Sequence, residues 1–309
     1  MKFKNIQLLV LLALCWGPSF MFIKLALSEL SPTVLSVFRI GIGAIILNVI
    51  LLASRNYLPR TLTFWKDSAI AAFFSVAFPF MLINWGQQHI DSSLGSLLNG
   101  TTPFFTVIFS MVLLKNERIA GNKIRGIVIG FAGLLVLVYP NFLGGIDASF
   151  LGIIAIVLAS ASYGIGWVWV KKRLTKTPSF KAPAAQLLIA TIYLLPIMFF
   201  ATPEAPLQDI SVLTIGSVLF LGVFGTAIAF ILYFKLIDQA GASYASMVTY
   251  LVPAIGVLLG TMVLQEAVTV WMLAGAVLIL YGIHIGGKKQ VDVCCPEKEI
   301  DFRIFSKFR

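Results

Sequence analysis

The sequence predicts an all-α integral membrane protein with ten transmembrane helices, arranged as two inverted five-helix repeats with both termini in the cytoplasm. Three observations support this fold class: the composition, a helical pattern that occurs twice, and the positions of the Lys and Arg residues. Of the 309 residues, 59% are hydrophobic and only 12% are charged, with a mean hydropathy of +0.95. A soluble domain carries roughly 25% charged residues, so the composition excludes a large soluble core.

Ten apolar stretches have about the ~20 residues that cross ~30 Å of hydrocarbon. They lie at about residues 5–27, 33–54, 68–87, 92–114, 121–139, 150–170, 184–202, 211–236, 242–264 and 269–286. The first is too long for a cleaved signal peptide and lacks a small-residue cleavage site, so it should stay in the protein. Residues 288–309 form a tail, in which two free thiols are favoured over an acyl anchor at Cys294 and Cys295.

The stretch from Asp91 to Glu117 carries small and polar residues on one helical face, and its pattern returns about 150 residues later. The first copy contains Ser93, Ser96, Pro103, Val107 and Leu114, and the second contains Ser243, Ser246, Pro253, Val257 and Leu264. One residue out of step, Glu117, Gly126, Val128 and Gly133 are matched by Glu266, Gly275, Val277 and Gly282. The chain therefore divides into repeats at residues 1–140 and 141–287. Five spans per repeat invert the second repeat relative to the first.

The charge distribution sets the predicted orientation. With a cytoplasmic N-terminus, 21 of the 23 Lys and Arg residues lie in inner segments, which is the pattern of membrane topology. The net charge of +10 does not indicate nucleic acid binding, because the basic residues occupy short loops rather than one face. We expect the chain to lie in the cell membrane, with the lipid bilayer and a small-molecule substrate as partners, and leave a homodimer open.

Certain residues carry a family resemblance. The first span contains the run from Cys15 to Phe20, the second contains Phe38 and Arg39, and the Pro-to-Glu-to-Gly pattern of the fourth occurs twice. With these motifs, residues 5–287 resemble the EamA family of the drug/metabolite transporter superfamily. The resemblance implies ten helices, a cavity between the repeats, and movement of small metabolites, often amino acids and usually outward.

The second half departs from that pattern at its start. Tyr163-Gly164 stands where the first half has Trp16-Gly17, and Gln186 falls near the place of Arg39. Trp16 and Tyr163 are expected to line the cavity, because Gly17-Pro18 and Gly164 loosen each helix at that level. Plain packing is the alternative reading, and the nearby Trp169 is assigned to the interfacial belt.

Polar groups at depth are the next candidates. Asn99 and Thr249 occupy matching positions, and Pro103 and Pro253 release the carbonyls of those two residues. These groups serve either the cavity wall or close helix packing. At the end of the third span, Asn84, Trp85 and Gln88 are candidates for an outer gate, whereas Gln87 and His89 fit an interfacial belt.

Two cations lie outside the inner segments. Lys24 is expected to snorkel outward and pair with Glu29. Arg39 lies about seven residues into its span, roughly 10 Å along a helix, where a cation needs a partner. The candidate partners are a substrate carboxylate, Glu266, or the carboxy-terminal carbonyls of a neighbouring helix.

The sequence predicts a carrier that works by alternating access, driven by the substrate gradient or by exchange. No Asp or Glu sits in mid-span, no GxxxxGK[ST] loop occurs, and no cofactor is expected. The two histidines lie at opposite faces, which disfavours a membrane-embedded enzyme. Amphipathic drugs and nucleoside-like metabolites are alternative substrates. The candidate substrate-binding residues are Trp16, Ser19, Arg39, Asn84, Trp85, Gln88, Asn99, Thr102, Tyr163, Trp167, Gln186, Thr249 and Tyr250.

Overall fold

The computed structural model describes residues 3–113, 121–143, 147–174, 180–200, 210–240 and 248–287, and within these ranges it contains helices and no strand. The first half of the chain forms α1 (Phe3–Trp16), α2 (Ser19–Ala26), α3 (Pro32–Ala53), α4 (Leu62–Ala72), the π-helix η1 (Phe73–Ala77), α5 (Phe78–His89), α6 (Ser92–Asn99), α7 (Thr102–Leu113) and α8 (Gly121–Leu143). The second half forms α9 (Ala148–Arg173), α10 (Lys181–Phe200), α11 (Val212–Gly222), the π-helix η3 (Val223–Ile228), α12 (Ala229–Ala240), α14 (Val248–Val263) and α15 (Val270–Gly287).

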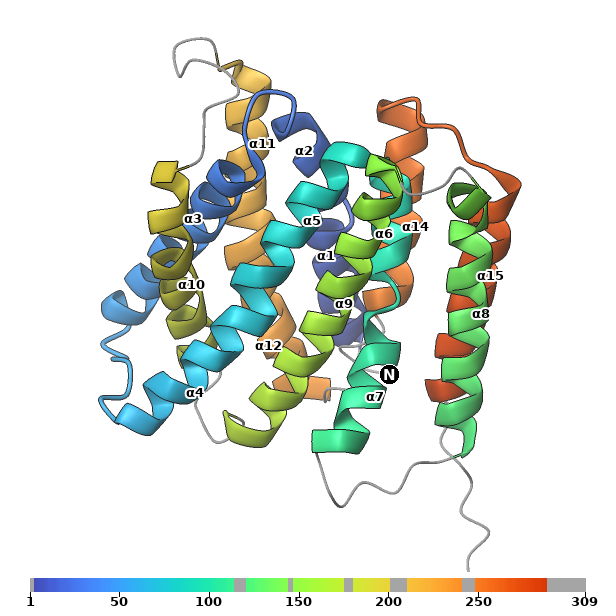
Figure 1. Ribbon diagram of the computed structural model, residues 1–309. Coiled ribbons are helices and arrows are strands. Elements are labelled where there is room, and N and C mark those ends of the chain that lie inside the picture. Colours follow the sequence, from blue (N-terminus) through green and yellow to red (C-terminus); the bar gives the residue numbers. More distant parts are fainter. Residues whose placement is uncertain are drawn as a thin grey trace, which may run out of the picture.

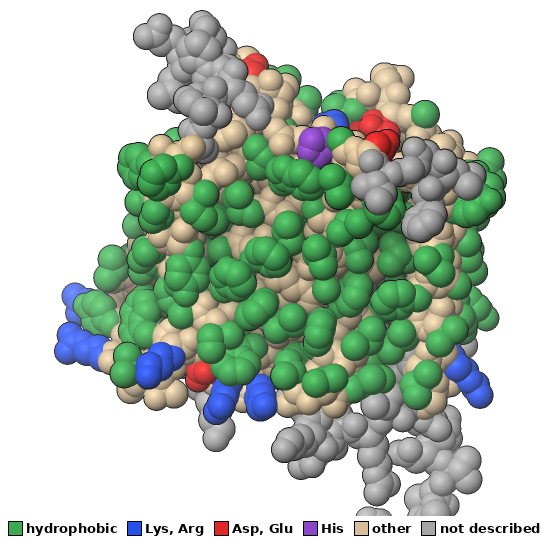
Figure 2. Space-filling view, in the orientation of Figure 1, with side chains coloured by type: hydrophobic (Ala, Val, Ile, Leu, Met, Phe, Trp, Pro, Cys, Tyr) green, Lys and Arg blue, Asp and Glu red, His purple; other side chains and the backbone are tan. Residues whose placement is uncertain are grey.

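Eight helical stretches are long and apolar enough to cross a membrane, and they coincide with eight of the ten predicted spans. The last two predicted spans contain the shorter apolar helices α14 and α15. Long apolar side chains cover the sides of the helices and face outward (Figure 2). Such a surface is stable only where lipid replaces water, so the structure agrees with a membrane protein.

Charged side chains gather at the two ends of the molecule (Figure 2). We call the end at which α4 begins and α9 finishes the basic end. It carries Arg55 and Arg60 between α3 and α4, and residues 171–173 at the close of α9. The opposite end, the acidic end, holds Glu29, Asp91 and Glu266 in turns between helices. That the basic end faces the cytoplasm remains a prediction from this segregation.

The spans are interrupted at mid-depth. Pro18 lacks an N–H, and α1 gives way to α2 at Gly17-Pro18. In the third span the chain widens into η1 just before Pro79, and the Phe78 amide donates to the Phe73 carbonyl five residues back. The eighth span contains the second π-helix, η3, about 150 residues after η1. π-helical turns often occur at functional sites, and the two lie at matching places in the two halves.

The expectation that Gly164 loosens its helix is wrong. Helix α9 runs without interruption from Ala148 to Arg173, and it lies in the centre of the bundle against α4, α5, α6 and α7. A Cβ built on Gly164 would lie 2.8 Å from the Phe105 carbonyl carbon and 2.9 Å from the Thr106 amide nitrogen. This glycine therefore serves the close approach of α7 to α9.

Helices α8 and α15 pack side by side at one edge of the bundle (Figure 1). Small residues bring their backbones together: a Cβ on Gly133 would lie 2.8 Å from the Ile279 amide nitrogen, and one on Gly275 would lie 2.8 Å from the Gly133 carbonyl oxygen. The remaining spans form a wider group around α9, in which α1, α2, α6 and α14 contact one another. This group contains the interruptions and the polar groups described next.

Candidate functional site

Four aromatic rings form a row across the bundle, which we call the aromatic row: Trp16, Tyr233, Trp167 and Tyr163. The ring centroids of Trp16 and Tyr233 lie 5.4 Å apart, those of Tyr233 and Trp167 lie 6.0 Å apart, and those of Trp167 and Tyr163 lie 6.0 Å apart. The rings come from α1, α12 and α9, so the row joins both halves of the chain. All four side chains are half-buried, which leaves ring surface for contact with a small molecule.

Arg39 lies near one end of the aromatic row. Its guanidinium carbon is 4.3 Å from the centroid of the Phe80 ring, and Phe80 contacts Tyr163 edge to face at 6.4 Å. Its Nε donates to Thr226 Oγ1 at 3.2 Å, and its Nη2 lies 3.5 Å from the Gly225 carbonyl oxygen. Both acceptors belong to η3, so a widened turn of the eighth span binds the cation of the second span.

The charge of Arg39 has no carboxylate within salt-bridge distance among the residues that the structure describes. Glu266, one predicted partner, is bonded elsewhere, so that alternative is wrong. A guanidinium has five N–H donors, and the two bonds to η3 use only part of them. Because an isolated cation at depth in a membrane costs at least about 2.5–3.5 kcal/mol, the residual charge favours an anionic ligand.

Ser19 lies beside the same turn of η3. Its side chain is buried, and its hydroxyl donates to the Cys15 carbonyl at 3.1 Å across the α1–α2 interruption. A Cβ built on Gly225 would lie 2.9 Å from Ser19 Oγ and 3.6 Å from Arg39 Nη2. Gly225 thus lies between a hydroxyl and a guanidinium, and the structure brings these two predicted site residues together.

The fourth span breaks at Gly100-Thr101, between α6 and α7. Pro103 cannot donate to the Asn99 carbonyl, and the Thr102 hydroxyl donates to it instead at 2.7 Å. The carbonyl released by Pro103 is therefore satisfied within the chain. The side-chain oxygen of Asn99 is buried and has no hydrogen-bond partner, so its carboxamide keeps an acceptor free at the break.

One turn of α14 contacts both interrupted spans. A Cβ on Gly17 would lie 2.5 Å from Ile255 Cγ2, and a Cβ on Gly100 would lie 3.2 Å from Pro253 Cγ. The same turn of α14 therefore packs against two breaks. One lies between Trp16 and Ser19, and the other lies between Asn99 and Thr102. Discontinuous helices are typical of substrate sites in secondary transporters, because their loosened turns offer polar groups at the midplane.

The predicted outer-gate residues lie apart from the aromatic row. Asn84 is fully buried and donates to Ser36 Oγ at 2.8 Å, which ties α5 to α3. Trp85 is 38% exposed and its ring packs against His89, with centroids 4.7 Å apart. Gln88 is half-buried. The belt expectation for Gln87 is wrong, because its side chain is fully buried and donates to the Phe20 carbonyl at 3.1 Å.

The remaining predicted residues lie elsewhere. Gln186 is buried in α10, which packs on α3, α4 and η1, and its amide nitrogen has no hydrogen-bond partner. The side chains of Thr249 and Tyr250 lie outside the described part of the structure, as do Cys294 and Cys295.

Tyr233 is a member of the aromatic row that sequence reasoning missed. It lies three residues from the predicted end of the 211–236 span, where a tyrosine is typical of an interfacial belt. In the structure it connects Trp16 to Trp167 and so completes the aromatic row.

Charged groups at the acidic end hold helix termini. Lys24 does not pair with Glu29 as expected: its ammonium donates to the carbonyls of Gln87 and Ile90, at 3.0 and 2.9 Å. Glu29 accepts from the Ser211 amide at 2.8 Å, at the start of α11. This hydrogen bond from the Ser211 backbone, with a contribution from its hydroxyl, lowers the pKa of Glu29.

Glu266 caps α6 from the turn that follows α14. Its carboxylate accepts from the amides of Ser92 and Ser93, at 2.7 and 2.9 Å, and from the Ser93 hydroxyl. Burial alone would raise the pKa of Glu266, but the hydrogen bonds from Ser93 and Ser92 outweigh it and lower the pKa. Burial and the nearby Glu266 raise the pKa of Asp91, partly offset by Lys24.

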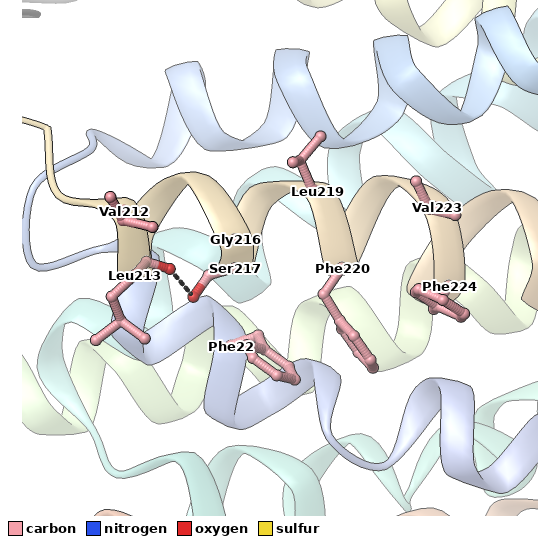
Figure 3. A pocket seen from close by; sticks show the side chains of 9 residues that line it. All are labelled: Phe22, Val212, Leu213, Gly216, Ser217, Leu219, Phe220, Val223 and Phe224. Carbon is pink, nitrogen blue, oxygen red and sulfur yellow. Dashed lines mark hydrogen bonds between the residues drawn. The ribbon is translucent and has the colours of Figure 1, made fainter.

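A hollow of about 660 Å³ lies between α2 and α11 and is lined by Phe22 and by eight residues of α11 and η3 (Figure 3). Its one polar side chain, Ser217, donates to the Leu213 carbonyl at 2.8 Å and is thereby satisfied. The hollow is apolar and offers no group for a polar substrate. The described residues contain no group of three or more His, Cys, Asp or Glu side chains arranged for a metal ion.

Comparisons with known proteins point in one direction. The model of the EamA-like transporter family matches residues 4–139 and 150–285. An uncharacterized transporter, YoaV of Bacillus subtilis (strain 168), is 28% identical over 277 residues, covering 90% of this chain and 94% of the relative. A probable amino-acid metabolite efflux pump of Escherichia coli (strain K12) is 28% identical over 295 residues, covering 92% and 95%. A solved structure with 17% identity superposes with a TM-score of 0.67 over 93% of this chain and 98% of that chain, which supports the fold.

Proposed function

The chain belongs to the EamA-like transporter family, and on that premise we propose that it exports amino acids or related metabolites across the cell membrane by alternating access. The substrate site is the aromatic row together with Arg39, Ser19, Asn99 and Thr102. The observation that carries the proposal is the position of a buried guanidinium, free of any described carboxylate, beside rings from both halves of the chain.

The chemistry of this site fits a carboxylate joined to an apolar body. A guanidinium presents parallel N–H donors that match the two oxygens of a carboxylate, and such charge-assisted bonds are short and strong. The aromatic row supplies flat apolar surface for the rest of the molecule. The free acceptor of Asn99 suits an ammonium or amide group of the same substrate. A probable amino-acid metabolite efflux pump among the relatives agrees with this class.

Counterflow in proteoliposomes tests the proposal. Vesicles are preloaded with unlabelled amino acids, their N-acyl derivatives, nucleosides or amphipathic cations, and uptake of the labelled compound is followed. We expect saturable, trans-stimulated uptake of carboxylate-bearing compounds, which is lost in Trp16→Ala and Asn99→Ala. Selective counterflow of cationic amphiphiles or nucleosides by folded protein would overturn the substrate class. Uptake unaffected by either substitution would move the site elsewhere.

A further inference from the structure

Helices α6 and α14 meet in a close seam at the acidic end. A Cβ built on Gly256 would lie 2.5 Å from Ser96 Cβ, and one on Gly260 would collide with Ser93 Oγ. The two glycines and the two serines are spaced by about one helical turn on their helices. Small residues at this spacing let the backbones touch, so no passage remains between α6 and α14 in the structure observed.

Glu266 lies across the end of this seam. After α14 the chain turns at Gln265, whose φ of 55° is unusual for a residue other than glycine and costs of order 1–3 kcal/mol. The Glu266 amide donates back to the Gly260 carbonyl at 3.0 Å, which fixes the turn on α14. From there the carboxylate reaches the amides of Ser92 and Ser93 at the start of α6. A strained turn is thus held by bonds to a different helix.

Helix α6 is a short segment with a break at one end. It has eight residues, about 12 Å in length, and it ends at the Gly100-Thr101 break. Its far end carries Asn99, with a free side-chain oxygen. Loops and helix breaks absorb the backbone rotation of domain motions, so a tilt of α6 about this break would part it from α14 and expose Asn99.

We propose that Glu266 is the latch of the access gate at the acidic end: its carboxylate holds α6 against α14, and its release opens the substrate site to that side. The inference rests on the proposed function, because a gate has meaning only for a carrier. The latch is a positioning residue, since it holds α6 and does not contact substrate.

The charged groups near Glu266 bear on whether its carboxylate leaves α6 with or without taking up a proton. The groups facing Glu266 are Asp91 at the start of α6 and, through Asp91, Lys24 of α2, whose ammonium is bonded to the end of α5. Hydrogen bonds keep Glu266 ionised in the closed state, so its release is a mechanical separation at neutral pH rather than a proton uptake. The two interrupted spans that carry Ser19 and Asn99 both contact the Pro253–Ile255 turn of α14, so a rearrangement of these spans on substrate binding is the direct route to that separation.

Thiol accessibility tests the latch without any substrate. A single thiol is introduced by Ser96→Cys, in a background carrying Cys15→Ala, Cys294→Ala and Cys295→Ala, because Ser96 is fully buried in the seam. A membrane-impermeant maleimide is added to each side of sealed vesicles in turn. We expect slow labelling with Glu266 present. With Glu266→Ala, labelling should be about tenfold faster, and only from the side that the acidic end faces, because α6 is no longer held against α14. A tenfold change corresponds to about 1.4 kcal/mol.

Glu29→Ala is the matched control. Glu29 caps α11 through the same kind of amide-to-carboxylate bond, but it does not cross the α6–α14 seam, so labelling should stay slow. An unchanged labelling rate in folded Glu266→Ala protein would mean that Glu266 only caps α6, and it would contradict the proposal that Glu266 holds the gate closed. Should Glu266→Ala not fold, Glu266→Gln is measured in its place. The labelling rate should then rise at least threefold, and an unchanged rate would count against the proposal. Labelling needs no transport, so failure of counterflow leaves this test intact.

Discussion

Arg39 Nε lies 3.2 Å from Thr226 Oγ1, and this hydrogen bond joins residues 187 positions apart in the chain. It links the second span to the π-helical turn of the eighth. A buried guanidinium is thereby positioned beside the aromatic row by a hydroxyl and a carbonyl, neither of which neutralises it. The charge remains available to a ligand, and the first prediction follows from it.

Arg39→Gln should lower counterflow at least about tenfold while the protein still inserts and purifies as a folded species. A charge-assisted bond to a carboxylate contributes about 1.5–3 kcal/mol, and one factor of ten corresponds to about 1.4 kcal/mol. Counterflow and size-exclusion chromatography measure the two effects. Arg60→Gln, at an exposed loop position, is the control. Loss of folded protein in Arg39→Gln alone would assign Arg39 a structural role.

Tyr233→Ala should abolish saturable transport, whereas Tyr233→Phe should keep most of it. The ring of Tyr233 contacts both Trp16 and Trp167, so its removal opens a gap in the middle of the aromatic row, and phenylalanine restores the ring contacts. KM and maximal rate are measured by tracer uptake. Tyr281→Ala serves as the control, because the Tyr281 side chain on α15 is 55% exposed. Equal activity of the Ala and Phe variants would remove Tyr233 from the site.

Thr102→Val should lower the free energy of unfolding by about 1–3 kcal/mol, because it leaves the Asn99 carbonyl without its hydroxyl donor at the break. Thr102→Ser retains the donor and should recover most of that loss. Thermal unfolding of the purified protein in one detergent ranks the three proteins. If the Val and Ser variants unfolded at the same temperature, the Thr102 bond would carry no net stability.

Gly256→Ala should hold α6 and α14 apart, because the new methyl group would lie 2.5 Å from Ser96 Cβ. Transport should fall, and the additional substitution Ser96→Gly should restore it by removing that methyl-to-methylene clash. Gly216→Ala is the control, since a Cβ at that position has open space around it. Counterflow of the single and double variants gives the comparison. A double variant as inactive as Gly256→Ala would argue against steric closure of this seam.

The stabilising effect of Glu266 should depend on pH with a defined sign. Its pKa is lowered in the folded state, so its contribution is present above the unfolded-state pKa of about 4.3 and is lost as pH falls through the folded-state value. The unfolding temperature should exceed that of Glu266→Gln by a constant amount from pH 8 to 5, and the difference should shrink at lower pH. Burial and the nearby Glu266 raise the pKa of Asp91, so acidification also changes the charge of Asp91, and both proteins therefore carry Asp91→Asn. A difference that grew on acidification would contradict the assignment.

Much of the fold could be predicted from the sequence because it rests on local properties. The apolar stretches follow from composition, and their charged ends follow from the position of each Lys and Arg. The interruptions near Pro18 and Pro103 follow from a missing N–H and a ring that clashes with the preceding turn. Arg39 could be selected as a candidate because a cation at depth is unusual in a membrane span. Trp16 and Tyr163 could be selected because they occupy matching places beside glycines in the two halves.

The partners of those residues were decided by the tertiary structure. No local rule brings Arg39 to Thr226, Glu266 to Ser92 and Ser93, or Tyr233 between two tryptophans, because each pair is joined only when helices distant in the chain pack together. The sequence by itself determined which groups needed partners in lipid. Only the packing of the helices decided which partner each received, since a polar group in a dry interior bonds to whichever donor or acceptor the neighbouring helix presents.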